Sequence, residues 1–314
     1  MNNFSQDVSC KALWLMDDGG LLTDTIGTNT LVDHGGVAQS VDCKVGVKCG
    51  SFGSGTWLGR DDADLGIGFP LKASDTVKNI SICFWCKRSS KAEYSVFSKS
   101  NYGNGAILDI AIANADEKLQ ILLGYNSGSS YQTVKSGLVM GLAKWYHVGV
   151  TYEDSSKAYR MRIWDDEASI CWDAAGTATN NINVEASNIS VGADGDGAYE
   201  FEGLIDEVAI FNDILTVDEI DEIRRGVYGV SEVGVQLSTG RPDGTVFGQS
   251  GDKISFHGAD PVVQASGAAQ AECPAGGTGA AAGCFDTAAH RDECIGLITE
   301  MRETLLKLGL MRGY

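Results

Sequence analysis

One carboxylate in this chain stands among apolar neighbours and therefore needs a chemical partner. Alternation along its strand-like run places Asp206 on one face with three aliphatic side chains: Leu204, Val208 and Ile210. A carboxylate on such a face is costly unless it is paired. Hydrogen bonds from backbone amides are one way to pair it. A structural Ca²⁺ ion is the other, because calcium binds carboxylate, carbonyl and water oxygens, and Asp24 and Asn29 in an N-terminal turn offer such oxygens.

Paired carboxylates would also suit glycoside hydrolysis, which needs two of them facing one bond. Glu200 and Glu202 alternate onto one face, but the next position on that face is Leu204. Asp206 and Glu207 are adjacent, so strand geometry predicts that they point in opposite directions. The four histidines form no triad with a Ser or Cys at a suggestive spacing. We therefore predict no catalytic residue, and a glycosidase is the weakest of three functional hypotheses.

Aromatic residues beside amide side chains predict a carbohydrate site, because rings stack on sugar faces while amides bond hydroxyls. The candidates lie in or near expected loops: Tyr102, Asn104, Tyr125, Asn126 and Tyr131. Trp57 is a further loop aromatic, whereas Trp164 and Trp172 are more simply explained as core residues. The pattern does not specify a glycan.

The composition narrows the class of protein. A formal net charge of −18 argues against nucleic acid or an anionic membrane as a partner. The sequence has no run of about 18 apolar residues, so we predict no membrane span, and the N-terminus lacks the pattern of a secretory signal. With an odd count of nine cysteines, these features predict a reducing cytoplasm and mostly free thiols. Cys83 and Cys86 have the spacing of a metal or redox pair, but in a strand their thiols point to opposite faces.

Short strands between Gly, Asn, Asp and Ser turns occupy the first ~230 residues, which is typical of an antiparallel sandwich. The expected strands are 12–16, 80–85, 94–98, 107–112, 119–123, 145–152, 159–164, 189–191 and 204–211. The expected buried residues are Trp14, Phe84, Trp145, Val148, Val208 and Ile210. A helix should follow at 216–223, because Thr216 and Glu219 form a capping box.

Four segments resemble laminin-G-like (concanavalin A-like) jelly-roll domains over residues 8–230. They are Leu13–Asp17, Ile80–Lys87, Lys144–Tyr152 and Phe201–Phe211. The resemblance implies two packed sheets of about six or seven strands each. It also implies that the loop after the first strand approaches the closing strand, often with Ca²⁺ between them, which brings Asp24 and Asn29 towards Asp206. This fold serves lectins, adhesins, pentraxins and spacers, so it does not fix one function.

The tail has a different character, and we divide the chain into residues 1–230, a β/loop connector at 231–284 and a helix at 285–314. One apolar stripe runs along that helix: Ile298, Met301, Leu305 and Leu308. So short a helix is unstable alone, so a copy from another subunit is its expected partner. The last ~75 residues resemble C-terminal modules of tailed-bacteriophage virion proteins, such as head fibres, decoration proteins and tail-associated proteins. Such modules commonly trimerise.

These features predict a mainly β chain: a jelly-roll sandwich, a small β-rich segment and a C-terminal oligomerising helix. The leading hypothesis is a homotrimeric virion protein, assembled in the host cytoplasm beside other virion proteins and displaying the sandwich towards host-surface carbohydrate. A carbohydrate-binding adhesin unrelated to a virus is the second hypothesis.

Overall fold

A computed structural model describes residues 2–229, except 93, 101–106, 127–129 and 196, and within the tail 253–254, 262–263, 296 and 298–303. The chain divides into two compact units, Met1–Val230 and Ser231–Tyr314. Tyr102, Asn104, Leu305 and Leu308 lie outside the described residues.

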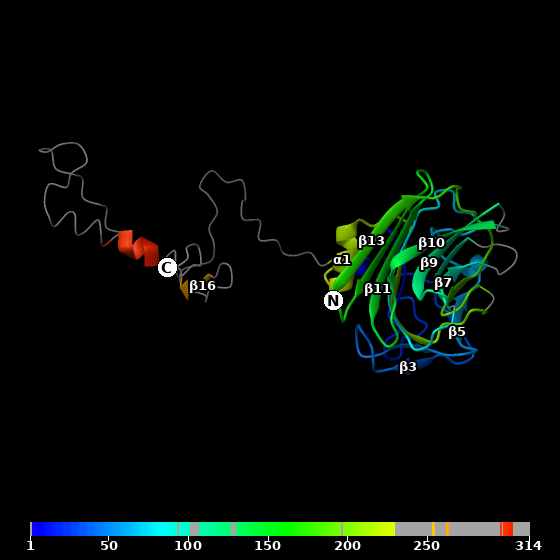
Figure 1. The fold of residues 1–314 in the computed structure, drawn as a ribbon, viewed down its shortest axis with the longest axis horizontal. Coiled ribbons are helices and arrows are strands. Elements are labelled where there is room, and N and C mark those ends of the chain that lie inside the picture. The colour runs from blue at the N-terminus through cyan, green and yellow to red at the C-terminus, as the bar shows by residue number, and fades with distance from the viewer. Residues whose placement is uncertain are drawn as a thin grey trace, which may run out of the picture. The chain divides into compact units, whose positions relative to one another are not determined.

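The first unit is a sandwich of two antiparallel sheets, here named sheet A and sheet B (Figure 1). In spatial order sheet A contains β13 (Ile170–Thr177), β12 (Ala158–Asp165), β11 (Tyr146–Glu153), β6 (Ile80–Arg88), β15 (Gly203–Phe211), β4 (Cys49–Phe52) and β3 (Ala38–Ser40), and β1 (Cys10–Trp14) also pairs with β15. Sheet B contains β10 (Ser130–Val139), β9 (Lys118–Tyr125), β8 (Leu108–Ile112), β7 (Tyr94–Lys99), β14 (Ile189–Val191), β5 (Trp57–Arg60) and β2 (Val32–His34). Short 3-10 turns occur at Phe4–Gln6 and Asp62–Asp64. The predicted two-sheet architecture is confirmed.

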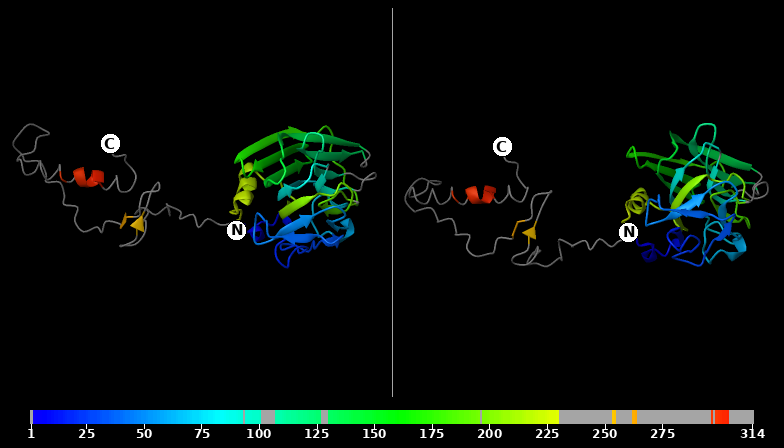
Figure 2. Two further views of the ribbon diagram at one scale, coloured as in Figure 1. Left: turned by 60° about the horizontal axis from the view of Figure 1, so that its bottom comes forward. Right: turned by 90° about the horizontal axis from the view of Figure 1, so that it is seen from below.

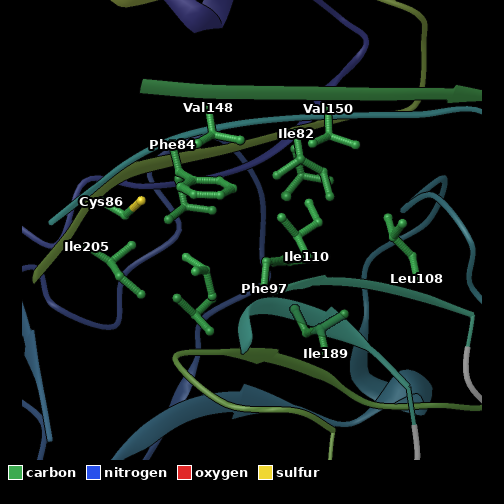
Figure 3. Packing of buried hydrophobic residues seen from close by; sticks show 14 of the residues in the cluster. Ile82, Phe84, Cys86, Phe97, Leu108, Ile110, Val148, Val150, Ile189 and Ile205 are labelled. Atoms are coloured by element: carbon green, nitrogen blue, oxygen red, sulfur yellow. The ribbon is translucent and has the colours of Figure 1, made fainter. Parts of the chain in front are cut away.

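The core lies between the two sheets (Figure 3). Ile82, Phe84 and Cys86 of β6 face it from sheet A, while Ile110 and Ile189 face it from sheet B. Five of the six residues predicted to be buried are at most 1% exposed: Trp14, Phe84, Val148, Val208 and Ile210. Trp145, the sixth, is only half-buried, because it comes one residue before β11 begins.

A second apolar layer covers the outer face of sheet A. Helix α1 (Val217–Arg225) lies there (Figure 2) and packs through Ile220 and Ile223. The helix comes so close to β11 that a Cβ on Gly149 would lie 2.6 Å from Ile220 Cγ2. The predicted capping box is present, since Thr216 Oγ1 accepts the Glu219 N–H and the Glu219 carboxylate accepts the Thr216 N–H.

The two cysteines of β6 separate as the strand geometry predicts. Cys83 lies under α1 in the outer layer, whereas Cys86 lies in the sandwich core. Burial raises the pKa of the Cys86 thiol to about 12 and also raises the pKa of the Cys83 thiol, which leaves both as unreactive apolar groups.

Strand β15 contains a β-bulge at its most acidic point. Asp206 pairs with Trp85 of β6, but the next paired residue, Ala209, pairs with Cys83. Three steps along β15 therefore match two along β6, and Glu207 takes a positive φ of 49°.

Because of this extra residue, two of the predictions made from alternation are wrong. Val208 and Ile210 belong to the sandwich core together with Ile205, whereas Asp206 lies opposite Trp85 on the outer face. Asp206 therefore does not share a face with Val208 and Ile210. Nor do Asp206 and Glu207 point to opposite sides, because Glu207 lines the same outer groove as Trp85.

In the tail, β16 (Lys253–Ile254) pairs with β17 (Val262–Val263), and residues 298–303 are helical. Ile298 and Met301 on that helical segment are 65% and 60% exposed. The described part of the chain contains no helix both long and apolar enough to cross a membrane.

Candidate functional site

Asp24 sits in a cradle of N–H groups. Its Oδ1 accepts the backbone N–H groups of Leu13, Ile26 and Gly27 at 2.9–3.0 Å. Its Oδ2 accepts the backbone N–H of Asn29 at 2.9 Å and the Asn29 side-chain amide at 3.1 Å. Both oxygens of this buried carboxylate are therefore engaged by donors that pin the loop after β1.

Asn29 extends the same network. Its Oδ1 accepts the Gly66 N–H at 2.7 Å, and its Nδ2 donates to the Lys11 carbonyl at 2.8 Å. Its own carbonyl accepts the indole N–H of Trp14 at 2.8 Å, which ties the loop to the sandwich core.

Asp206 holds a different loop. Its Oδ2 accepts the N–H groups of Lys44 and Val45 at 2.8 and 2.7 Å. Asp17 Oδ1 accepts those of Val47 and Lys48, at 3.1 and 2.9 Å. Two carboxylates thus clamp residues 44–48 against the outer face of sheet A.

This donor set does not fit a calcium cage. The oxygens of Asp24 and Asn29 that were predicted to face a cation instead accept N–H groups. In the part of the chain that the structure describes, no three His, Cys, Asp or Glu side chains gather as a metal site. The alternative considered for Asp206, pairing with backbone amides, matches its observed contacts, so we derive no role for calcium from these three residues.

Burial sets the charge of the two bulge carboxyls. Asp206 is fully buried, and burial raises its pKa to about 6 although backbone N–H groups oppose the shift. Glu207 is 2% exposed, and burial raises its pKa to about 7, opposed by the hydrogen bond from Asn2 and reinforced by the nearby Asp206.

Aromatic rings and cations line the outer face of sheet A beside the bulge. Trp164, His147, Trp85 and Asp206 are direct cross-strand neighbours on β12, β11, β6 and β15. The Arg224 guanidinium lies 4.0 Å from the Trp164 ring centroid, while Lys44 Nζ lies 4.8 Å from that of Trp85. The expectation that Trp164 is a core residue is therefore wrong, whereas Trp172 does pack against the core.

The outer face of sheet B has a row of mostly small or polar residues that crosses all seven strands, and Ser98 and Ser190 at its centre are 0% exposed. Strand pairing aligns Thr133, Leu122, Asp109, Ser98, Ser190, Gly59 and Val32. Ser95, on the same face, donates a hydrogen bond to Asp109. We call this row the polar row of sheet B.

Aromatic side chains stand at both ends of the polar row. At the β5 end, the rings of His34 and Trp57 stack with centroids 3.7 Å apart and planes 2° from parallel. Trp57 lies across Gly59, where a Cβ would come within 2.3 Å of the indole. At the β10 end, Tyr131 is 58% exposed.

The predicted carbohydrate residues are only partly brought together. Tyr131 pairs with Gly124 and so shares the face of the polar row, and exposed Asn126 follows at the β9 end. Tyr125 alternates with Leu123 and is half-buried on the core side of β9. The sequence did not predict His34 as a site residue. Its only signal there is its position two residues past a short apolar run.

A model of the concanavalin A-like lectin/glucanases superfamily (Laminin_G_3) matches residues 61–221, which is 161 of the 314 residues. This chain therefore belongs to the Laminin_G_3 family of the concanavalin A-like lectin/glucanases superfamily. No curated protein matches the chain.

Two solved structures have the same fold. Domain 4 of an extracellular GH43 arabinanase from Geobacillus stearothermophilus, solved with arabinotriose, is 16% identical with a TM-score of 0.52, over 68% of this chain and 98% of that one. The binding domain of Paraclostridial Mosquitocidal Protein 1 is 14% identical with a TM-score of 0.51, over 70% of this chain and 52% of that one.

Proposed function

We propose that the sandwich is a non-catalytic carbohydrate-binding domain and that it binds glycan along the polar row of sheet B. The observation that carries the proposal is the aromatic pair His34–Trp57 at one end of that row, with Tyr131 at the other. Rings of this kind stack on the apolar faces of sugars, while Asp109 and Thr133 between them supply groups for hydroxyls. The family and the arabinotriose-bound fold relative support the same class of ligand.

A hydrolytic role has weaker support. Asp206 is fully buried and bonded to two loop amides, and Glu207 bonds Asn2. Neither carboxyl is arranged with a second one across an open cleft, as glycosidases require.

We expect the full-length chain to give a signal on a glycan array that Trp57→Ala and Tyr131→Ala each weaken by about tenfold. Loss of one stacking ring removes about 1–1.5 kcal/mol of contact, which is about tenfold in affinity. Ile170→Ala, a change at a 54% exposed residue of β13 in sheet A, is the matched control and should bind normally. Normal binding by both aromatic variants would refute the location, and a featureless array would refute the function.

We further propose that the protein is a homotrimeric virion component, displayed on a bacteriophage particle through its tail. The support is the resemblance of the tail to phage modules and the exposed pair Ile298 and Met301 on a helical segment. An exposed apolar stripe gains stability when a second copy covers it.

Light scattering should then give the mass of a trimer for the full chain and of a monomer for the double variant Ile298→Glu, Met301→Glu. Charges buried at the seam destroy the association. Ile170→Glu, a change at a 54% exposed residue of the sandwich, should stay trimeric. A wild-type monomer, or a double variant that keeps its assembly, would rule the trimer out.

A further inference from the structure

Buried polar atoms without partners gather at one place on sheet A. Among the described residues eight buried side-chain nitrogen or oxygen atoms have no hydrogen-bond partner, and four of them surround the bulge. These four are Trp85 Nε1, His147 Nε2, Asp206 Oδ1 and Arg224 Nε, the last of which lies 3.6 Å from Asp221 Oδ1 in an ion pair. Unsatisfied groups in a native protein point to function or to a missing partner, and half of them in one cluster is not a random scatter.

Strand pairing makes the cluster compact. Asp206, Trp85 and His147 are direct neighbours across β15, β6 and β11, so adjacent members stand on strands about 4.8 Å apart. The rings of Trp85 and His147 meet edge to face at 5.1 Å. Arg224 reaches the same face from the last turn of α1.

A groove of about 290 Å³ opens beside this cluster. Trp85 and Glu207 of sheet A line it, together with Asn2, Lys44 and Arg224. Lys44 covers Trp85 and pairs with Asp166, but both partners are partly exposed, and such a pair is worth at most about 1 kcal/mol. A ligand can therefore displace Lys44 and reach the indole N–H.

The chemistry of the residues that line the groove defines what fits. Trp85 Nε1 and the Arg224 guanidinium are donors and the Glu207 carboxyl is an acceptor, whereas Asp206 is fully buried and does not line the groove. His147 is neutral, since burial lowers its pKa to about 3. A hydroxyl both donates and accepts, so a small molecule with several hydroxyls satisfies this mixture, and the groove has the size of one sugar ring.

We propose that this groove is a second binding site, for a single polyhydroxylated sugar unit held by Trp85, Glu207 and Arg224, which line it. The proposal rests on the proposed function only for the class of ligand, because this site lies on the opposite sheet from the polar row.

The test is saturation-transfer NMR on the full chain with free glucose, galactose, arabinose and N-acetylglucosamine. Trp85→Phe keeps an aromatic ring, though a smaller one, and removes the N–H, and loss of one hydrogen bond should weaken binding of the recognised sugar about fivefold to tenfold. Trp172→Phe, the same change at a tryptophan on β13, is the matched control and should leave it unchanged. Trp57→Ala and Tyr131→Ala report on the polar row and should leave a sheet A signal in place.

The outcomes separate the two sites. Binding weakened by Trp85→Phe but not by Tyr131→Ala supports the second site, even if no glycan binds the polar row. Binding that only Trp57→Ala and Tyr131→Ala abolish overturns the second site and keeps the first. Absence of any monosaccharide signal from the wild-type chain would also overturn it.

Discussion

The double variant Asp206→Asn, Glu207→Gln should exceed wild type in stability by a margin that grows by on the order of 3 kcal/mol between pH 5 and pH 8. Both carboxyls are buried, and burial raises their pKa values to about 6 and about 7. Their unfolded pKa values are about 3.9 and 4.3, and a tenfold change in a protonation equilibrium corresponds to about 1.4 kcal/mol. The stability that their protonated forms contribute is fully present below about pH 4 and is lost as pH rises through 6 and 7.

The side-chain amides of the introduced Asn and Gln can keep the hydrogen bonds that the two carboxyls accept. Asp206 Oδ2 alone accepts both loop N–H groups, so the oxygen of an Asn can keep them. Glu207 Oε1 accepts the Asn2 amide, a bond that the oxygen of a Gln can also accept. The neutral side chains therefore mimic the protonated acids at every pH.

The titration of His147 changes the stability of the fold in the opposite direction over the same pH range. Its folded pKa is lowered to about 3 by burial, so stability is lost as pH falls below its unfolded value of about 6.5. This contribution is common to wild type and variant, so it cancels in their difference. Asp17 and Asp42, whose pKa values are lowered, lose their contributions only at more acidic pH.

Urea unfolding followed by tryptophan fluorescence at pH 5, 6, 7 and 8 measures the difference. Asp64→Asn, which neutralises an exposed carboxylate, is the control and should follow wild type at all four values. A double variant whose advantage does not change with pH would show that the bulge carboxyls titrate normally.

The sequence allowed most of the fold to be predicted, because period-2 runs and the capping box carry their own geometry. All nine expected strands and α1 are present. Strand β10 was missed because its outward positions are polar and only Val134 and Leu138 touch the core. Strands β2 to β5 are three or four residues long, too short for alternation to show.

The site was harder to predict, for a reason visible at β15. A bulge adds one residue without changing the composition of the run, so alternation counted from Leu204 assigns every later side chain to the wrong face. The sequence correctly marked Asp206 as a carboxylate that needs a partner, but its partners are loop amides 161 and 162 residues away. Such long-range contacts leave no local pattern.

Asp24→Ala should destabilise the sandwich by on the order of 3–5 kcal/mol, without any dependence on calcium. The carboxylate is 7% exposed and accepts five N–H bonds, from Leu13, Ile26, Gly27 and twice from Asn29. Each buried donor left without an acceptor costs about 1–3 kcal/mol, and water entering the cavity offsets part of the sum. Asp24→Asn should lose less, because it keeps one of the two accepting oxygens.

Asp33→Ala is the matched control for this change. Asp33 also accepts two turn N–H groups, from Gly36 and Val37, but it is exposed, so water can replace it at a cost below about 1 kcal/mol. Thermal unfolding followed by circular dichroism should show Asp24→Ala melting roughly 10 °C below wild type, since 1 kcal/mol shifts the midpoint of a domain this size by about 2–4 °C. Adding EDTA or millimolar CaCl₂ should leave every midpoint where it was, because the Asp24 oxygens already hold N–H groups. A calcium-dependent rise in the wild-type midpoint that Asp24→Ala abolishes would instead establish the ion at this turn.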